Sequence, residues 1–236
     1  MAQLRLTVQS ITPLLMYGAD NKDDRTNTSL KAKPELRATG VRGLLRYWLR
    51  AVLGSHARSS SDVFERESQI LGSTEVGSRV ALRVYQSGGM EEEKNLTVLP
   101  KQTRGYNLPF TGFPPESEFR ITLSTHPLDR DETLLGGDLL KAIFLMATMS
   151  GLGRRARRGS GNLRVLNVKG YEGERLPLDY LPEDQPSLSD YLQTVSRYVC
   201  STPLGRQTDF PVFATDTAVV LLSQQVHTDY EDAFQE

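Results

Sequence analysis

The sequence predicts an α+β protein, and three observations support this class. Several segments alternate apolar and polar residues, as half-buried strands do. Two others carry apolar residues at the spacing of a helix. Together they follow the order strand, helix, strand, strand, helix, strand. This βαββαβ order is that of the ferredoxin-like fold, which RNA-recognition modules share, so we expect such a core with long insertions and a C-terminal extension.

The first strand and the first helix are expected within the first 52 residues. Residues 4–11 alternate apolar and polar side chains, and Thr12-Pro13 ends this strand. Residues 17–33 are polar and should form a surface loop. A helix follows over residues 41–52, with Thr39 as its N-cap. The expected buried stripe of this helix consists of Val41, Leu44, Leu45, Trp48, Leu49 and Val52.

Two further strands are predicted in the middle of the chain, separated by a long insertion. Residues 63–71 are compatible with a helix, and residues 78–85 alternate as the second strand. Residues 86–115 are rich in Gly, Pro, Lys and Glu, and we expect a hairpin or a flexible finger. An insertion this long in a compact domain is more often functional than idle. Residues 118–124 form the third strand.

The second helix and the fourth strand flank a loop rich in glycine and arginine. Residues 139–149 have helical apolar spacing, and Asp138 is the expected N-cap. Residues 163–168 form the fourth strand. The second and third strands lack the aromatic stacking pattern of RNA-recognition modules, so arginines and loops would have to bind any RNA.

A change of composition after Gly170 suggests a boundary. Prolines then punctuate an acidic stretch, so we divide the chain into a core, residues 1–170, and an extension or reduced second half, residues 171–236. In the second part, residues 188–200 are compatible with a helix, and residues 212–222 contain a last strand.

Composition narrows the class of protein. The single cysteine, Cys200, excludes a disulfide framework and a cysteine-cluster zinc site, and it suits a reducing cytosol. The N-terminus lacks the layout of a signal peptide, and no apolar run approaches membrane-spanning length. We therefore expect a soluble, cytoplasmic protein without a membrane partner.

Basic residues are concentrated in two islands, although the net charge is only −1. Residues 31–58 contain seven Lys or Arg against one acid, and residues 151–170 contain six against none. Two islands on a balanced surface indicate a focused anion site rather than a protein that binds polyanions indiscriminately.

The second island is centred on the loop of residues 151–161. Glycine lets a phosphate approach the backbone closely, and the arginine fork pairs bidentately with phosphate oxygens. The candidate RNA-binding residues here are Gly153, Arg154, Arg155, Arg157, Arg158, Gly159 and Gly161. The alternative is a solvated basic turn, which is favourable at the C-terminus of the preceding helix.

The first island places arginines at intervals of four on the predicted first helix. Like charges at this spacing destabilise an isolated helix, so we expect an anion opposite them. The candidate RNA-binding residues are Arg37, Arg42, Arg46 and Arg50, and we expect the face of Arg42 and Arg46 to share one phosphate-binding groove with the loop. The alternative is a solvated face whose arginine stems cover apolar neighbours.

Several segments in and between these two islands form a recognisable set: Glu35-Leu-Arg, Arg42-Gly, Arg46-Tyr-Trp, Arg50-Ala, Gln69-Ile-Leu-Gly-Ser, Gly77-Ser-Arg and the whole loop from Gly151 to Gly161. In these segments the chain resembles the RAMP superfamily, and most closely the first-named RAMP subunit of the Cmr complex, the type III-B CRISPR effector. That resemblance implies a ferredoxin-like, non-catalytic RNA-binding subunit for antiviral defence. Its partners would be the 3′ region of the guide RNA, the target RNA and other type III effector subunits. The region after Gly170 is shorter than the second ferredoxin-like half of that subunit.

Metal-dependent RNA cleavage is the alternative function. Asp20, Asp23 and Asp24 follow the first strand, where target-slicing relatives carry a metal-linked aspartate, and clustered carboxylates can hold Mg²⁺ beside a phosphate. The same residue types are also common in any flexible loop. His56 lacks an evident partner for general base catalysis. A duplex-DNA regulator is disfavoured because no helix-turn-helix spacing is apparent. We therefore expect a binding protein without a cofactor rather than an enzyme.

Overall fold

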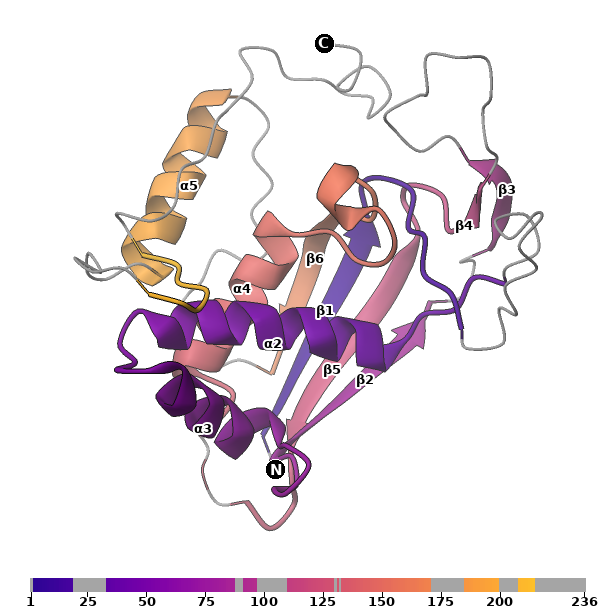
Figure 1. Cartoon of the computed structure of the whole chain (residues 1–236). Helices are drawn as coiled ribbons and strands as arrows, with labels where there is room; N and C mark the ends of the chain where they lie inside the picture. The colour runs from indigo at the N-terminus through magenta and orange to yellow at the C-terminus, as the bar shows by residue number, and fades with distance from the viewer. Residues whose placement is uncertain are drawn as a thin grey trace.

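The computed structural model describes residues 2–18, 33–87, 91–96, 110–129, 131, 133–170, 185–199 and 208–214. Figure 1 shows the arrangement of its elements. In chain order they are β1 Gln3–Ser10, α2 Ala38–Gly54, α3 Ser60–Leu71, β2 Val80–Gln86, β3 Glu93–Leu96, β4 Phe110–Gly112, β5 Glu118–Thr125, α4 Gly137–Met149, the 3-10 turn η1 Ala156–Arg158, β6 Leu163–Lys169 and α5 Gln185–Val199.

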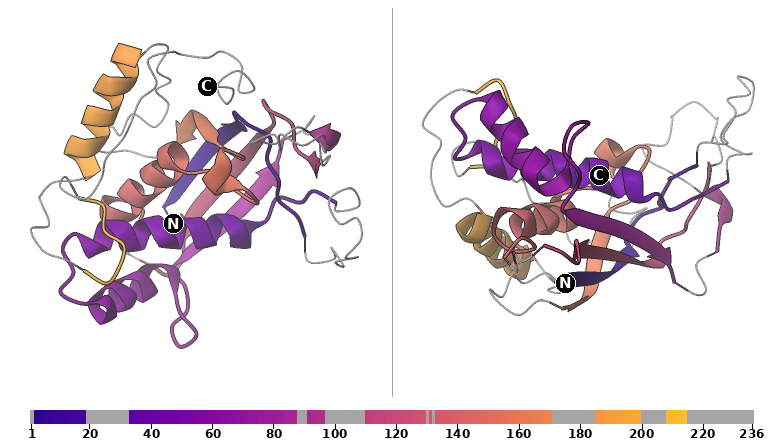
Figure 2. Two further views of the ribbon diagram at one scale, coloured as in Figure 1. Left: turned by 45° about the horizontal axis from the view of Figure 1, so that its top comes forward. Right: turned by 90° about the horizontal axis from the view of Figure 1, so that it is seen from below.

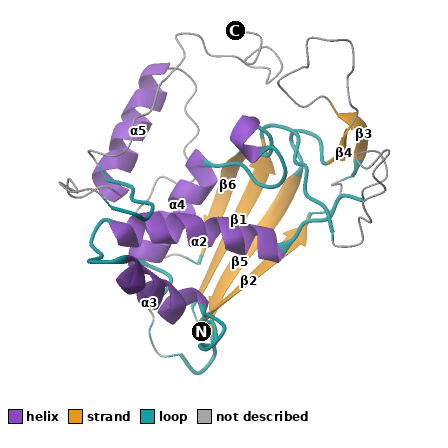
Figure 3. Ribbon diagram, viewed as in Figure 1, coloured by secondary structure: helices purple, strands orange, loops and turns teal. Residues whose placement is uncertain are grey.

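Four strands form an antiparallel sheet in the order β2-β5-β1-β6, which confirms the α+β class. The central helices α2 and α4 lie on one face of this sheet (Figures 2 and 3). The predicted succession of strands and helices is present, with α3 added between α2 and β2. A second, two-stranded sheet of β3 and β4 is inserted before β5.

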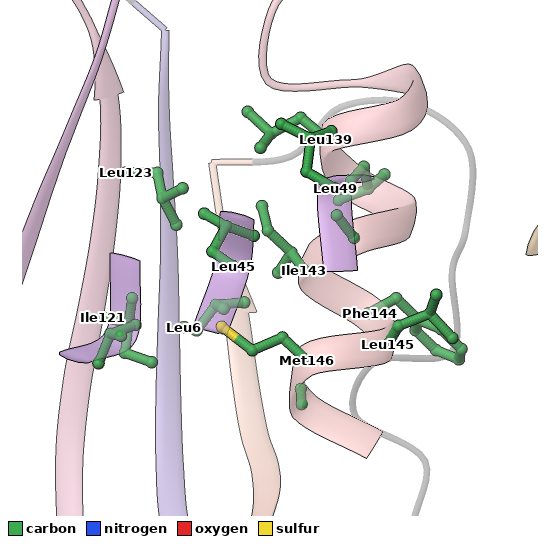
Figure 4. Close-up of a cluster of buried hydrophobic side chains, with 14 of the residues drawn as sticks. Leu6, Leu45, Leu49, Ile121, Leu123, Leu139, Ile143, Phe144, Leu145 and Met146 are labelled. Atoms are coloured by element: carbon green, nitrogen blue, oxygen red, sulfur yellow. The ribbon is translucent and has the colours of Figure 1, made fainter. Parts of the chain in front are cut away.

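The hydrophobic core lies between this sheet and the two helices. Alternate residues of β1 and β5, among them Leu6 and Ile121, point toward the helices and are fully buried. They meet Leu45 of α2 and Met146 of α4 (Figure 4). Burying one such side chain contributes about 1.5–3 kcal/mol, so the helix-facing stripes predicted from the apolar spacing hold the layers together.

Both predicted N-caps are wrong. Helix α2 begins at Ala38 with Arg37 as its N-cap and no side-chain capping bond. The entering chain is held instead by the segment after β1, because the backbone N–H of Glu35 donates to the carbonyl of Met16 at 2.8 Å. Helix α4 begins at Gly137, and Gly136 is its N-cap in extended conformation. Asp138 therefore lies in the first turn.

The outer elements agree with most expectations. The predicted helix over residues 63–71 is α3, and the hairpin expected within residues 86–115 is the β3–β4 pair, although residues 97–109 lie outside the described residues. Helix α5 matches the helix expected over residues 188–200, and it packs on α4 through Tyr191 and Phe144, whose ring centroids are 5.9 Å apart.

The strand expected over residues 212–222 is described only at residues 212–214, which form no strand. Among the described residues, no helix combines the length and the apolar composition needed to span a bilayer.

Candidate nucleic-acid interface

The glycine–arginine loop, residues 151–161, is fixed to the segment that follows β1. The N–H of Gly161 and the hydroxyl of Ser160 both donate to the carbonyl of Pro13, at 2.9 Å and 2.6 Å. The N–H of Arg154 donates to the carbonyl of Leu15 at 2.7 Å. These bonds hold the loop backbone in a defined shape, so the arginines project from a positioned platform.

Two glycines are required by this close packing. Gly153 has φ of +82° and Gly161 has φ of +70°, in the region that other residues rarely adopt. A Cβ atom on Gly153 would collide with the carbonyl of Leu15, and one on Gly161 would collide with the carbonyl of Leu152. Both predicted glycines therefore shape the loop, and Gly159, with φ of +79°, ends the turn η1.

The four loop arginines do not play the same part. The guanidinium of Arg155 lies over the ring of Phe110 in β4, with its central carbon 4.7 Å from the ring centroid. Partial burial lowers the pKa of Arg155, and the positive charges of Arg158 and Arg154 lower it further. Arg154, Arg157 and Arg158 are exposed, and within the described parts of the chain none forms an ion pair.

A cleft of about 1030 Å³ separates this loop from the N-terminal half of α2. Four of the predicted residues line it: Arg37 from the start of α2, and Gly153, Arg154 and Arg157 from the loop. The described residues that line this cleft include no acidic side chain and no histidine. Among its described lining residues, the cleft therefore carries positive charge without a counterion.

Aromatic side chains form part of the cleft wall. Tyr47 is 52% exposed and packs edge-on against Trp48 at 5.4 Å between centroids, and Trp48 packs in the same way against Phe213 at 5.9 Å. Sequence analysis assigned no role to Tyr47. The sequence pattern could have indicated its exposure, because Tyr47 falls outside the apolar stripe of its helix and its ring must therefore face outward.

A third ring in the wall is Tyr17. Burial raises the pKa of Tyr17, and the nearby positive charge of Arg154 partly opposes this shift. Its hydroxyl donates to the carbonyl of Thr111 at 2.7 Å. Tyr17 therefore remains a neutral hydrogen-bond donor that joins the cleft wall to β4.

The other three predicted arginines of α2 do not line this cleft. Arg42 donates to the carbonyls of Leu71 and Val80, each at 3.1 Å, and to the hydroxyl of Ser78 at 3.2 Å. Burial lowers the pKa of Arg42, as does the positive charge of Arg46. These bonds attach α2 to the end of α3 and to the edge of the sheet.

Arg46 and Arg50 face α3, which lies on the side of α2 away from η1 (Figure 1). Both form ion pairs with Glu67, whose side chain is completely buried. Arg46 also donates to the carbonyls of Leu71 and Gly72, at 2.8 Å and 2.6 Å. An anion does lie opposite these two arginines, but it is a carboxylate of the same chain. The structure therefore does not bring the face of Arg42 and Arg46 into one groove with the loop, as the sequence had led us to expect.

The structure provides little evidence for a catalytic role of the candidate residues. Asp20, Asp23 and Asp24 lie outside the described residues. His56 has two partners that the sequence did not suggest: its Nδ1 hydrogen-bonds with the Ser55 hydroxyl at 2.8 Å, and its Nε2 lies 3.5 Å from the carboxylate of Asp138. These contacts join the end of α2 to the start of α4. The described residues contain no group of three or more side chains suited to hold a metal ion.

Comparison with known families gives one match that covers most of the chain. The model of the RAMP superfamily matches residues 7–164. Two curated relatives come from Pyrococcus furiosus. The CRISPR system Cmr subunit Cmr1-1 is 27% identical over 147 residues, which is 57% of this chain and 42% of that relative. The Cmr subunit Cmr1-2 is 29% identical over 188 residues, which is 67% of this chain and 92% of that relative.

Solved structures share the fold. The apo crystal structure of Cmr1 from Pyrococcus furiosus has a TM-score of 0.55 and 23% identity, and the match covers 83% of this chain and 58% of that one. A chain of a type III-B Cmr-beta complex, bound to cognate target RNA and AMPPnP in the presence of ssDNA, has a TM-score of 0.50 and 15% identity over 72% of this chain and 56% of that one. The present chain thus spans less than half the length of the first curated relative.

Proposed function

The chain belongs to the RAMP superfamily, and from this premise we propose that it is an RNA-binding structural subunit of a type III-B CRISPR effector complex. We assign the βαββαβ core to the ferredoxin-like fold, in agreement with the strand order β2-β5-β1-β6. The curated relatives are both Cmr subunits, and the related Cmr-beta complex is bound to target RNA. The partners of this chain would be other effector subunits, the target RNA and the 3′ region of the guide RNA.

The observation that carries this proposal is the cleft between the loop and α2. Arg37, Arg154 and Arg157 line it, no described residue of its lining is acidic, and Tyr47, whose side chain is half exposed, forms part of its wall. Positive groups that follow a phosphate backbone, together with aromatic rings on which bases stack, are the combination that binds single-stranded nucleic acid. We place phosphates at the arginines and one base against Tyr47, with Arg158 at the outer edge of the loop.

This mode of binding would tolerate many sequences. Phosphate contacts position a strand but carry no base information, and stacking on a tyrosine accepts any base. Such tolerance suits a subunit whose complex takes its sequence specificity from a guide RNA. Within the described lining of the cleft, the side chains are suited to hold RNA and include no carboxylate or imidazole to move a proton. We therefore propose a non-catalytic role.

Salt dependence of RNA binding tests the proposal. The variant Arg154→Gln/Arg157→Gln removes two phosphate ligands, so the log–log slope of affinity for an oligouridylate of about eight nucleotides should fall by about 1.4. The control Arg58→Gln/Arg197→Gln removes the same charge from exposed positions outside the cleft and should leave the slope unchanged. RNA recovered after incubation with Mg²⁺ should be intact. Equal slopes for the two variants, or cleaved RNA, would contradict the proposal.

A further inference from the structure

One face of the four-stranded sheet carries neither α2 nor α4 (Figure 2). Residues on this face come from the alternate positions of each strand, and cross-strand pairing aligns them in rows. One row crosses all four strands as Arg83, Thr122, Arg5 and Lys169. Three of its four members are cationic, so the row is a basic band across the sheet.

The adjacent row adds a further arginine and an aromatic ring. It runs as Tyr85, Arg120, Thr7 and Asn167 in the same strand order. Tyr85 is 46% exposed at the β2 edge. A shallow hollow of about 630 Å³ opens here, lined by Arg5, Arg83, Arg120 and Tyr85 among other residues.

The cations of these rows have no counterion within the described residues. Arg5, Arg83, Arg120 and Lys169 take part in none of the ion pairs found there. The Nε of Arg5 is buried without a hydrogen-bond partner, while its Nη2 donates to the side chain of Gln3 at 3.2 Å. A buried donor without a partner is unfavourable, so the intramolecular bonds of Arg5 do not satisfy its whole guanidinium.

The next row on the same face, Glu118, Gln9 and Arg164, contains charges of both signs that are linked by hydrogen bonds. Arg164 donates to the side-chain oxygen of Gln9 at 2.6 Å, and the Gln9 amide donates to Glu118 at 3.5 Å. Positive and negative ends are therefore linked through Gln9. The contrast makes the unpaired charge of the Arg83–Lys169 row a specific feature rather than the general character of the sheet.

The chemistry of the two rows favours a nucleic-acid strand over a protein partner. Their eight residues include one aromatic and no aliphatic side chain, whereas the centre of a protein–protein interface is usually apolar. Neighbouring strands are about 4.8 Å apart, so Arg83 and Arg5, two strands apart, present charges about 10 Å from each other. An extended phosphate backbone can span this distance, and Tyr85 offers a ring for a base.

We propose that this face, which carries neither α2 nor α4 and is defined by Arg5, Arg83, Arg120, Lys169 and Tyr85, is a second binding surface for single-stranded RNA. It goes beyond the cleft because α2, the wall of that cleft, lies on the other side of the sheet (Figure 2). Arg83, Arg5 and Arg120 would bind phosphates, and Tyr85 would stack on a base. A short strand would occupy one surface at a time.

Binding of short RNA to the full chain tests this second surface. With a 4-thiouridine-labelled oligonucleotide of about eight nucleotides, the wild type should bind two strands, and photo-crosslinks should map to Tyr85 as well as to the cleft. In the variant Arg83→Gln/Arg120→Gln, the affinity of the sheet surface for RNA should fall about tenfold or more. The Tyr85 crosslink should therefore be lost, and the stoichiometry should fall to one strand per chain. The exposed pair Arg58→Gln/Arg197→Gln is the charge-matched control.

The loop variant separates the two sites. Arg154→Gln/Arg157→Gln should abolish the cleft crosslinks and keep the one at Tyr85, so failure of either site is seen independently of the other. The inference is overturned if the wild type gives no crosslink at Tyr85. It is also overturned if Arg83→Gln/Arg120→Gln, with unchanged circular dichroism, reduces binding of a polyglutamate peptide but not of RNA, because the surface would then recognise an acidic protein.

Discussion

Arg46 of α2 forms an ion pair with Glu67 of α3, whose carboxylate is completely buried. This pair, with the bonds from Arg46 to the carbonyls of Leu71 and Gly72, attaches α3 to α2. The basic spacing of α2 therefore serves the attachment of two helices. RNA binding, as we propose it, is left to the loop and to the start of α2.

Replacing Arg46 should destabilise the protein without weakening RNA binding. Arg46→Ala leaves the buried Glu67 with only Arg50 and removes the donor to two carbonyls, so we expect a loss of about 2 kcal/mol in the free energy of unfolding. Urea denaturation measures it. Arg66→Ala, which breaks the exposed pair with Asp62, is the control and should leave the free energy of unfolding almost unchanged. A drop in RNA affinity with unchanged stability would show that Arg46 contacts RNA after all.

The conformation of Gly153 should be needed for the cleft. In Gly153→Ala, the positive φ and the collision with the Leu15 carbonyl force the loop away from the segment after β1, at a cost of about 1–3 kcal/mol. RNA affinity should fall because Arg154 and Arg157 are displaced. Gly77→Ala is the control, since a Cβ there has open space, and it should behave as wild type. Fluorescence anisotropy with labelled RNA and thermal melting together measure both effects.

Asp129 should titrate well below an ordinary aspartate. Hydrogen bonds and charge from Arg79 lower the pKa of Asp129 to about 2. A carboxyl whose pKa is depressed on folding contributes stability above its unfolded pKa near 3.9, and that contribution is lost as the pH falls toward 2. In Arg79→Gln the pKa of Asp129 should rise toward its usual value. NMR titration of the carboxyl measures it, and an unchanged pKa would mean that Arg79 is not the cause.

The stability difference between wild type and Arg79→Gln should follow the same ionisation. It should be constant above about pH 5 and shrink between about pH 4 and pH 2, as Asp129 becomes protonated in both proteins. Melting temperatures across this range measure it. A difference that stays the same at pH 2 would mean that packing of Arg79, rather than its charge, stabilises the loop after β5.

Features of the fold could be predicted from the sequence where residues close together in the chain determine them, and could not where distant residues do. The strands were recognisable because Leu4, Leu6 and Val8 alternate with polar residues, and α4 because its apolar residues recur each turn. The start of α2 was misplaced because Arg37 is held by Met16, far away in the chain, and not by a local cap. The exposure of Tyr47 was detectable from the helical stripe, but its place in a cleft wall was not.

The sequence by itself determined the order of the core elements, the buried face of each, and the two islands of positive charge, because these properties depend on local periodicity and composition. Only the tertiary structure decided which arginines are paired. Glu67 of α3 pairs with Arg46 and Arg50 because α3 packs against α2. Arg37 lines the same cleft as Arg154 and Arg157, although more than a hundred residues separate them in the chain. Charge pairing depends on distances between elements, and spacing along the chain does not encode those distances.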